Sequence, residues 1–148
     1  MKLSMTGDYA IRAMLYLSSK GYGEIVHISE ISKNADVPES LLRKITGQLV
    51  KAGLLHSHRG KGGGIALAHQ PELITLLDVI EVIEGKIFLN QCIIAPDFCV
   101  RSNYCSVHVV WREVQEMMVE ILGSKNLSVL AFENQKLPDN YLPDVAYE

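Results

Sequence analysis

The 148-residue chain contains no apolar run near the roughly 20 residues that a membrane-spanning helix requires. Its unbroken apolar stretches, of which residues 13–17 form one of the longest, are far shorter. The first residues also lack the positive-then-apolar layout of a secretion signal, because Asp8 and Arg12 fall within a helix-like pattern there. We therefore expect a cytoplasmic protein that has no membrane partner.

Cysteine is scarce, and its number is odd. In a reducing compartment, three cysteines favour a metal site or a redox sensor over a disulfide framework. An apolar fraction of 48% with 21% charged residues excludes disorder as the dominant state, and the length fits one small domain with an appended element. The sequence shows no set of residues typical of a catalytic site, so we expect a protein that is not an enzyme.

Positive charge is concentrated in one half of the chain. Residues 1–70 hold nine Lys and Arg against five acids, a net charge of +4, whereas residues 71–148 have a net charge of −7. This division suggests that the first half faces a polyanion, although an unevenly charged solvated surface would explain the same numbers. The motifs have to distinguish these alternatives.

Residues 8–53 predict three helices in the order of a helix-turn-helix. The mostly apolar stretch 8–19 predicts a largely buried helix, and residues 29–34 predict a short second helix. Asp36-Val37-Pro38-Glu39 combines a capping residue, an early proline and an acid three residues after the cap, which predicts the start of the third helix. This helix is expected to end at Gly53.

The third predicted helix has two distinct faces. Its buried stripe is expected to contain Leu41, Leu42, Ile45, Leu49 and Val50. The other face carries three cations and no acid, and we predict that its side chains bind DNA. These predicted DNA contacts are Ser40, Arg43, Lys44, Gln48 and Lys51. Gly47 on the same face is either a close-approach position for a phosphate or a tolerated surface glycine.

Two short segments, 54–58 and 65–68, flank a glycine-rich tip and predict a β-hairpin. The tip holds Arg59 and Lys61 without an acidic neighbour, and a hairpin that follows a helix-turn-helix makes a winged helix. Cations on such a loop can enter the narrow minor groove of DNA. A nucleotide-binding loop is disfavoured, because the G-K-[ST] ending and a following helix are both missing.

The second half of the chain predicts two further helices and a tail. Residues 75–85 form a helix capped by Thr75 and Asp78. Residues 106–122 form a long helix with an apolar seam at heptad-like spacing, which implies a second copy as partner, with packing on the wing domain as the alternative. The seam contains Val107, Val110, Val114, Met117 and Ile121. Residues 131–148 are expected to be a poorly ordered C-terminal tail.

Residues 86–105 show no periodicity and hold all three cysteines, in the spacing Cys92-x6-Cys99-x5-Cys105-x2-His108. Structural zinc usually binds paired C-x2-C motifs, whereas thiolates spread over a loop are typical of iron–sulfur clusters. A Cys-His hydrolase site fits three loop thiols poorly. The spacing therefore favours a cluster, with zinc and unligated redox thiols as alternatives.

Three segments of the chain resemble one bacterial family. They are the N-terminal stretch 1–17, the wing 59–67 and the cysteine loop that runs into residues 108–112. Over residues 1 to about 130 the sequence is similar to the winged-helix regulators that include the iron–sulfur regulator IscR and the nitric-oxide-sensing repressor NsrR. We predict a mainly α fold with a small β-wing: a winged helix-turn-helix domain over 1–70, and a cluster-binding loop with a long dimerisation helix over 71–130.

The resemblance implies a homodimer with one cluster per subunit and a palindromic DNA operator. In the IscR-like branch, Cys92, Cys99, Cys105 and His108 would hold a [2Fe-2S] cluster, which we favour. In the NsrR-like branch, Asp8 of the partner subunit would replace the histidine and complete a [4Fe-4S] cluster. The spacing from Cys92 to Cys99 exceeds the common IscR spacing by one residue.

The sequence thus predicts a DNA-binding transcriptional regulator whose operator binding is controlled by an iron–sulfur cluster that senses iron, redox or nitric oxide status. One alternative keeps the DNA-binding function and replaces the cluster by structural zinc or direct thiol sensing. An alternative from another class is a cluster-bearing electron-transfer protein, and the basic helix face with its wing argues against it.

Overall fold

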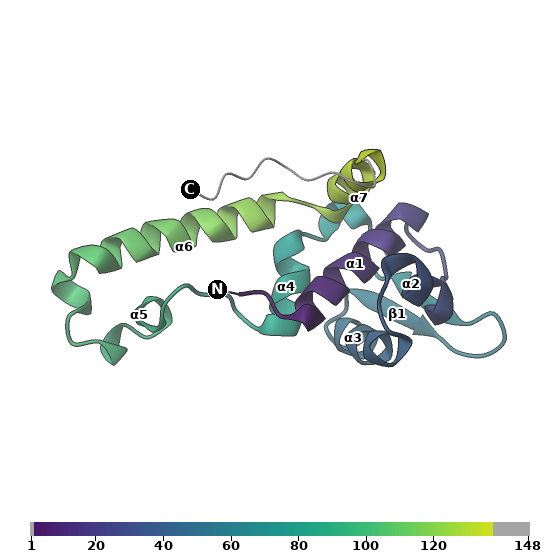
Figure 1. The fold of residues 1–148 in the computed structure, drawn as a ribbon, viewed down its shortest axis with the longest axis horizontal. Helices are drawn as coiled ribbons and strands as arrows, with labels where there is room; N and C mark the ends of the chain where they lie inside the picture. The colour runs from purple at the N-terminus through teal and green to yellow at the C-terminus, as the bar shows by residue number, and fades with distance from the viewer. Residues whose placement is uncertain (1, 138–148) are drawn as a thin grey trace.

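The computed structural model describes residues 2–137, which form a body and an arm (Figure 1). The body contains α1 (Met5–Lys20), α2 (Ile28–Ala35), α3 (Glu39–Lys51), β1 (Leu55–His58), β2 (Gly64–Leu67), α4 (Leu76–Glu84) and α7 (Leu127–Lys136). The arm contains α5 (Gln91–Ile94) and α6 (Ser106–Ser124). Single 3-10 turns cover Pro71–Leu73, Pro96–Phe98 and Ser102–Tyr104. These elements confirm the mainly helical fold with a small β-hairpin. Within the described residues, no helix combines the length and the apolar character that crossing a membrane would need.

Helix α1 packs against four other helices of the body. It contacts α2 and α3 on the helix-turn-helix side and α4 and α7 on the other. Its fully buried side chains recur at helical spacing and are Ala10, Ala13, Met14 and Leu17. The helix begins earlier than the sequence predicted, because Ser4 caps it: its Oγ accepts a hydrogen bond from the amide of Gly7 at 3.1 Å.

The turn between α2 and α3 differs from the predicted capping signal. Asp36 does not cap α3; it ends α2 in the left-handed conformation, with φ at 52°, and its amide donates to the carbonyl of Ser32. Aspartate tolerates this backbone region better than most residues. Helix α3 therefore starts after Pro38 without a side-chain cap, and the carboxylate of Glu39 is left for another partner.

The buried stripe of α3 is narrower than predicted. Leu42, Ile45 and Leu49 are fully buried, as expected, and Val50 is half-buried. Leu41 is 38% exposed and lies at the edge of the stripe, next to the polar face. Three buried leucine and isoleucine side chains are enough to fix the orientation of this helix on the body.

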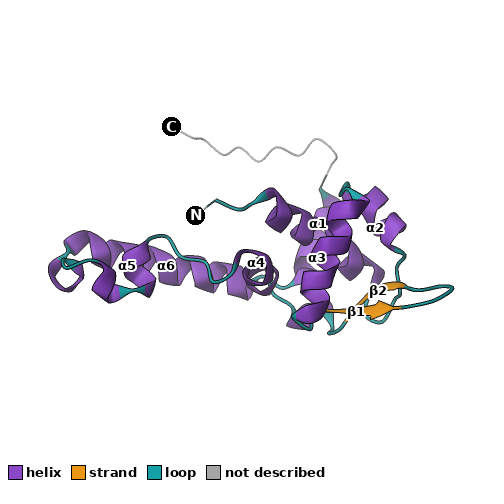
Figure 2. Cartoon of the chain, turned by 90° about the horizontal axis from the view of Figure 1, so that it is seen from below, coloured by secondary structure: helices purple, strands orange, loops and turns teal. Residues whose placement is uncertain are grey.

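The predicted hairpin is present beside α3, and Figure 2 shows its tip projecting from the body. The strands are antiparallel, with Leu55 opposite Leu67 and His58 opposite Gly64. Leu55 and Leu67 are buried and anchor the hairpin to the core. A Cβ on Gly64 would lie 2.4 Å from the carbonyl oxygen of Val26, so only glycine fits at this close backbone approach.

The end of the described chain is helical, which corrects the expected tail. Helix α7 packs on α1 and buries Leu127 and Ala131, so residues 131–136 belong to the body. The rest of the predicted tail, residues 138–148, lies outside the described residues. The predicted capping box of α4 is confirmed: Thr75 Oγ1 accepts from the amide of Asp78 at 3.1 Å, and the Asp78 carboxylate accepts from the amide of Thr75 at 2.8 Å.

Candidate nucleic-acid interface and cysteine pocket

The predicted DNA-contacting residues of α3 share one face of the helix and are all exposed. They are Ser40, Arg43, Lys44, Gln48 and Lys51. Burial of the opposite face holds these side chains away from the body. A Cβ built on Gly47, within the same face, would meet nothing within 4 Å, so packing inside the chain does not require glycine at this position.

Glu39 lies next to the face of α3 that was expected to be free of acids. The Glu39 carboxylate forms an ion pair with the Arg43 guanidinium, one helical turn away. Both side chains are accessible to solvent, and solvent-accessible pairs of this kind contribute little to stability. Arg43 can therefore exchange this partner for a base edge or a phosphate at small cost.

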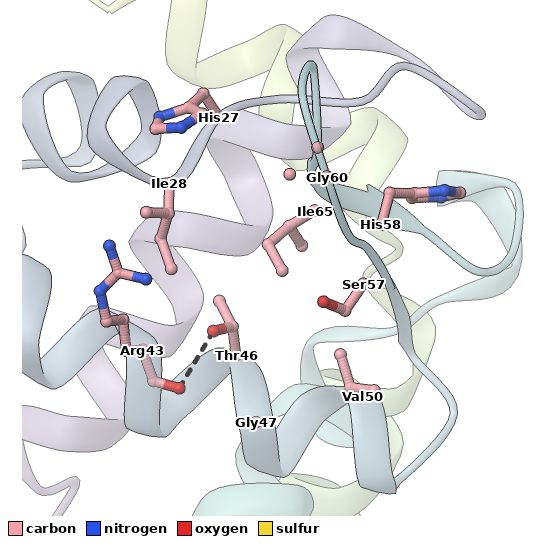
Figure 3. A pocket seen from close by; sticks show the side chains of 12 residues that line it. His27, Ile28, Arg43, Thr46, Gly47, Val50, Ser57, His58, Gly60 and Ile65 are labelled. Carbon is pink, nitrogen blue, oxygen red and sulfur yellow. Dashed lines mark hydrogen bonds between the residues drawn. The ribbon is translucent and has the colours of Figure 1, made fainter.

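A groove of about 400 Å³ separates α3 from the wing (Figure 3). The apolar part of its lining comes from Ile28, Val50 and Ile65. Figure 3 shows His27 and Arg43 on the α2 side of the opening, and Ser57 and His58 on the wing side with the His58 ring turned outward. The charged or titratable side chains in this lining are thus all basic.

A second hollow lies on the other side of α3. It is lined by Thr6 from the first turn of α1, together with Lys44, Gln48 and Lys51 from the exposed face of α3. Gly47 lines both hollows, so the exposed face of α3 forms a ridge between them. A protruding basic helix between two depressions has the shape that enters a major groove.

The wing tip places Arg59 and Lys61 at the end of the hairpin, where both are exposed. Gly60 and Gly62 have φ values of 92° and 80°, which other residues rarely adopt. A Cβ on Gly63 would lie 2.3 Å from the carbonyl oxygen of His58, so the tip remains narrow only with glycine there.

Sequence reasoning missed the histidines of this region. His27 and His58 both line the groove, and His56 is exposed on the same strand as His58. Strand alternation puts residues 56 and 58 on one face, which is the signal that identifies them as surface groups. No sequence signal places His27 opposite His58, because that proximity depends on how α2 packs beside the wing.

The structure brings the predicted cluster ligands together around one pocket. Cys92 lies on α5, Cys99 follows a 3-10 turn, and Cys105 immediately precedes α6, whose first turn carries His108. All four line a pocket of about 230 Å³, together with Asn90, Phe98, Ser102, Val107 and Trp111. The three thiols are half-buried and unbridged, and His108 Nδ1 lies 3.4 Å from Cys92 Sγ.

The donors around this pocket are spread apart and do not meet at a single metal-binding point. Among residues 2–137, no three side chains of His, Cys, Asp or Glu converge closely enough to bind one metal ion. An iron–sulfur cluster contains several iron atoms, so its ligands surround a group instead of meeting at one point. Three half-buried thiols and an imidazole around a common pocket suit that requirement.

Asp8, the other predicted fourth ligand, lies in the first turn of α1 and does not line the cysteine pocket of its own chain. Its carboxylate is 2.7 Å from the Arg12 guanidinium and is partly exposed. Within a single chain, the structure therefore groups His108, and not Asp8, with the cysteines.

The predicted seam of α6 is exposed along its whole length. Its residues are Val107, Val110, Val114, Met117 and Ile121, and the side chain of Met117 is 60% exposed. The arm extends away from the wing, so the seam does not pack on the wing (Figure 1). A continuous apolar strip of this kind on a long helix is typical of an interface between protein chains.

Polar contacts hold the part of the chain that leads from α4 into the cysteine segment. Glu84, at the end of α4, accepts hydrogen bonds from the Ser4 amide at 3.1 Å and the Ser4 hydroxyl at 2.5 Å. Gln115 on α6 accepts from the Leu89 amide and donates to the Ile87 carbonyl, both at 2.9 Å. The chain that enters the cysteine segment is thus attached to the start of α1 and to the middle of α6.

Known proteins are similar to this chain in sequence. The sequence model of the Rrf2 family, described as an iron-dependent transcriptional regulator, matches residues 3–133. The HTH-type transcriptional regulator IscR of Xenorhabdus nematophila is 30% identical over 139 residues, which span 94% of this chain and 84% of that protein. The HTH-type transcriptional regulator NsrR of Bacillus licheniformis is 30% identical over 128 residues, or 86% of this chain and 90% of that protein.

A solved structure extends the comparison to the fold. The structure of CymR, the global cysteine regulator of B. subtilis, matches with a TM-score of 0.77 and 28% identity, over 90% of this chain and 98% of that one. The winged-helix fold and the resemblance to regulators such as IscR and NsrR are thereby confirmed. The chain belongs to the Rrf2 family of transcriptional regulators.

Proposed function

We propose that the chain is a homodimeric cytoplasmic regulator that binds a palindromic DNA operator under the control of an iron–sulfur cluster. The observation that carries this proposal is the pocket shared by Cys92, Cys99, Cys105 and His108, in a chain whose relatives are transcriptional regulators. The exposed basic face of α3 and the wing tip would provide the DNA contacts. The proposal assigns no enzymatic reaction to the chain.

The three thiolates and the His108 imidazole would hold a [2Fe-2S] cluster. Because His108 lies one helical turn after Cys105, both side chains reach the same pocket without help from another chain. Asp8 of the partner subunit, completing a [4Fe-4S] cluster, is the alternative. A bound cluster supplies a group that oxidants, nitric oxide or iron shortage can alter or remove.

Control of DNA binding would follow from linkage between the cysteine segment and its attachments. The Gln115 contacts connect the segment to the dimer helix, and the Glu84 contacts connect it to the start of α1, which also borders the hollow beside α3. Ordering residues 92–108 would favour one relative placement of the two recognition helices in the dimer. Loss of that order would remove the preference.

A second candidate function keeps the DNA-binding role and uses the thiols directly. The short distance between His108 Nδ1 and Cys92 Sγ and the likeness to CymR, the global cysteine regulator of B. subtilis, favour it. Structural zinc is a further alternative for the same ligands. Metal analysis and the visible absorption spectrum of anaerobically purified protein distinguish these candidates from a cluster.

We predict separate roles for Arg43 and Lys61 in DNA recognition. Arg43→Ala should lose about 1–3 kcal/mol of discrimination at one base pair, because a guanidinium can bind a guanine edge with two hydrogen bonds. Lys61→Ala should weaken binding to all sequences alike and reduce the salt slope by about one unit, because the amine binds phosphate. Fluorescence anisotropy with a selected operator and a random duplex measures both. Equal weakening of operator and random DNA by Arg43→Ala would exclude its role as a base reader.

We predict that Met117→Glu makes the protein monomeric. The substitution would place an unpaired charge in the dimer seam, and a palindromic site needs both subunits at fixed spacing. Light scattering should report the mass of one chain, and affinity for the two-half-site operator should fall, whereas Glu116→Gln on the same exposed helix serves as a control that leaves the dimer intact. A dimeric Met117→Glu protein would move the interface elsewhere.

We predict that Cys92, Cys99 and Cys105 are each required for cluster binding, because serine is a harder and poorer donor to iron than a thiolate. His108→Ala should lose the cluster or alter its spectrum and abolish the pH dependence of its reduction potential near neutrality, whereas Asp8→Ala should change neither. Iron content and potentiometry at several pH values measure both. An unaltered cluster in His108→Ala, with loss in Asp8→Ala, would instead favour a [4Fe-4S] cluster shared between subunits.

A further inference from the structure

The groove between α3 and the wing lies beside the face of α3 that we propose reads bases. We propose that this groove holds one sugar–phosphate strand of bound DNA, with His27 and His58 as phosphate contacts on its two sides. DNA affinity would then depend on pH. This inference rests on the proposed DNA-binding function and extends it to the strand beside the recognition helix.

The lining of the groove has the chemistry of such a strand. Sugar–phosphate backbone alternates apolar deoxyribose faces with anionic phosphates, and the groove combines aliphatic side chains with basic groups at its edges (Figure 3). Among the described residues that line it, none is Asp or Glu. Gly60, Gly63 and Gly64 contribute no side chain on the wing side, which leaves the groove open to an extended polymer.

The His27 ring is held in a defined orientation. Its Nδ1 accepts a hydrogen bond from the Ser29 amide at 3.4 Å and lies 2.7 Å from the Ser29 hydroxyl oxygen. With Nδ1 as acceptor, the neutral ring carries its proton on Nε2, which is then available to donate to a phosphate. After protonation, Nδ1–H can donate to the Ser29 hydroxyl oxygen instead. Both charge states of the ring therefore keep a partner on Ser29.

Glu30 is the acid near His27 in the sequence, and its carboxylate already has two other partners. Glu30 lies in the first turn of α2, three residues after His27, but it accepts a hydrogen bond from the Tyr16 hydroxyl at 2.8 Å and pairs with Lys20 at 3.0 Å. These partners lower the pKa of Glu30, with the Tyr16 hydrogen bond as the largest cause. From α3, the group on the same side of the groove is the Arg43 guanidinium. A phosphate beside His27 would therefore meet a cationic edge.

The surroundings of His58 are also basic. His56 shares its face of β1, Arg59 follows it in the chain, and Lys61 lies in the same exposed tip. His58 lines the groove from β1, and its ring points away from the centre of the groove (Figure 3). A strand that leaves the groove past the wing would bring a phosphate to this ring.

The sign of the pH effect follows from the charge of phosphate. An anion beside an imidazole favours the imidazolium, so binding raises the pKa of the ring in the complex above that in the free protein. DNA binding then takes up protons, and affinity increases as the pH falls through neutrality. This gain in DNA affinity is lost as the pH rises above the pKa that the imidazole has in the complex.

The test uses the full-length protein and a random-sequence duplex, because phosphate contacts do not depend on sequence. We expect the wild type to bind about tenfold more tightly near pH 6 than near pH 8, and His27→Asn and His58→Gln each to remove about threefold of that ratio. Asparagine also serves as a helix N-cap, so His27→Asn preserves the start of α2. The salt slope near pH 6 should fall by about one unit for each variant.

His69→Gln is the matched control, because His69 is exposed on the same half of the chain but does not line the groove. A double variant, His27→Asn with His58→Gln, that kept the wild-type pH ratio would overturn the proposal, as would an equal loss in His69→Gln. NMR of the imidazole Cε1–H signals provides a direct readout: DNA should raise the pKa of His27 and His58, and unchanged titrations would contradict the contact. Failure to bind duplex DNA at any pH would instead overturn the proposed function itself.

Discussion

The rest of the structure depends on the packing of α1. Its buried face, with Ala10, Ala13, Met14 and Leu17, supports the helix-turn-helix on one side and α4 and α7 on the other. Alanine at two of these positions lets neighbouring helices approach closely, and the larger Met14 and Leu17 fill the remaining space. A rotation of α1 would therefore move the recognition helix and the base of the arm together. This mechanical connection is what a sensor needs if a signal in the arm is to change DNA binding.

The arm combines the cysteine pocket and the exposed apolar seam on one helix. His108 reaches the cysteine pocket from the first turn of α6, and the seam represented by Met117 runs along the same helix. In the proposed homodimer, order in the cysteine segment would therefore change how two copies of α6 meet. The Glu84 contact with Ser4 provides a separate connection to the body, because it joins the end of α4 to the cap of α1.

Local signals in the sequence predicted local structure well. The Thr75–Asp78 capping box and the exposed side chain of Arg43 follow from spacing within one helix, and both are present. Asp36 was assigned the wrong role, because one residue can either cap the next helix or end the previous one, and the geometry of the turn decides. Helix α7 was missed because its stability comes from burying Leu127 and Ala131 on α1, a contact between the two ends of the described chain. The groove lined by His27 is formed by segments that are separated in the sequence, so residue spacing could not predict it.

In the proposed regulator, the cysteine pocket holds an iron–sulfur cluster. Iron and acid-labile sulfide counted in anaerobically purified protein, with the Mössbauer spectrum of the same sample, test it most directly. A [2Fe-2S] cluster predicts about two iron and two sulfide per chain, with a spectrum in which one iron site has nitrogen ligation. Zinc in place of iron, or three free thiols without bound metal, would contradict the claim and favour direct thiol sensing or a structural metal.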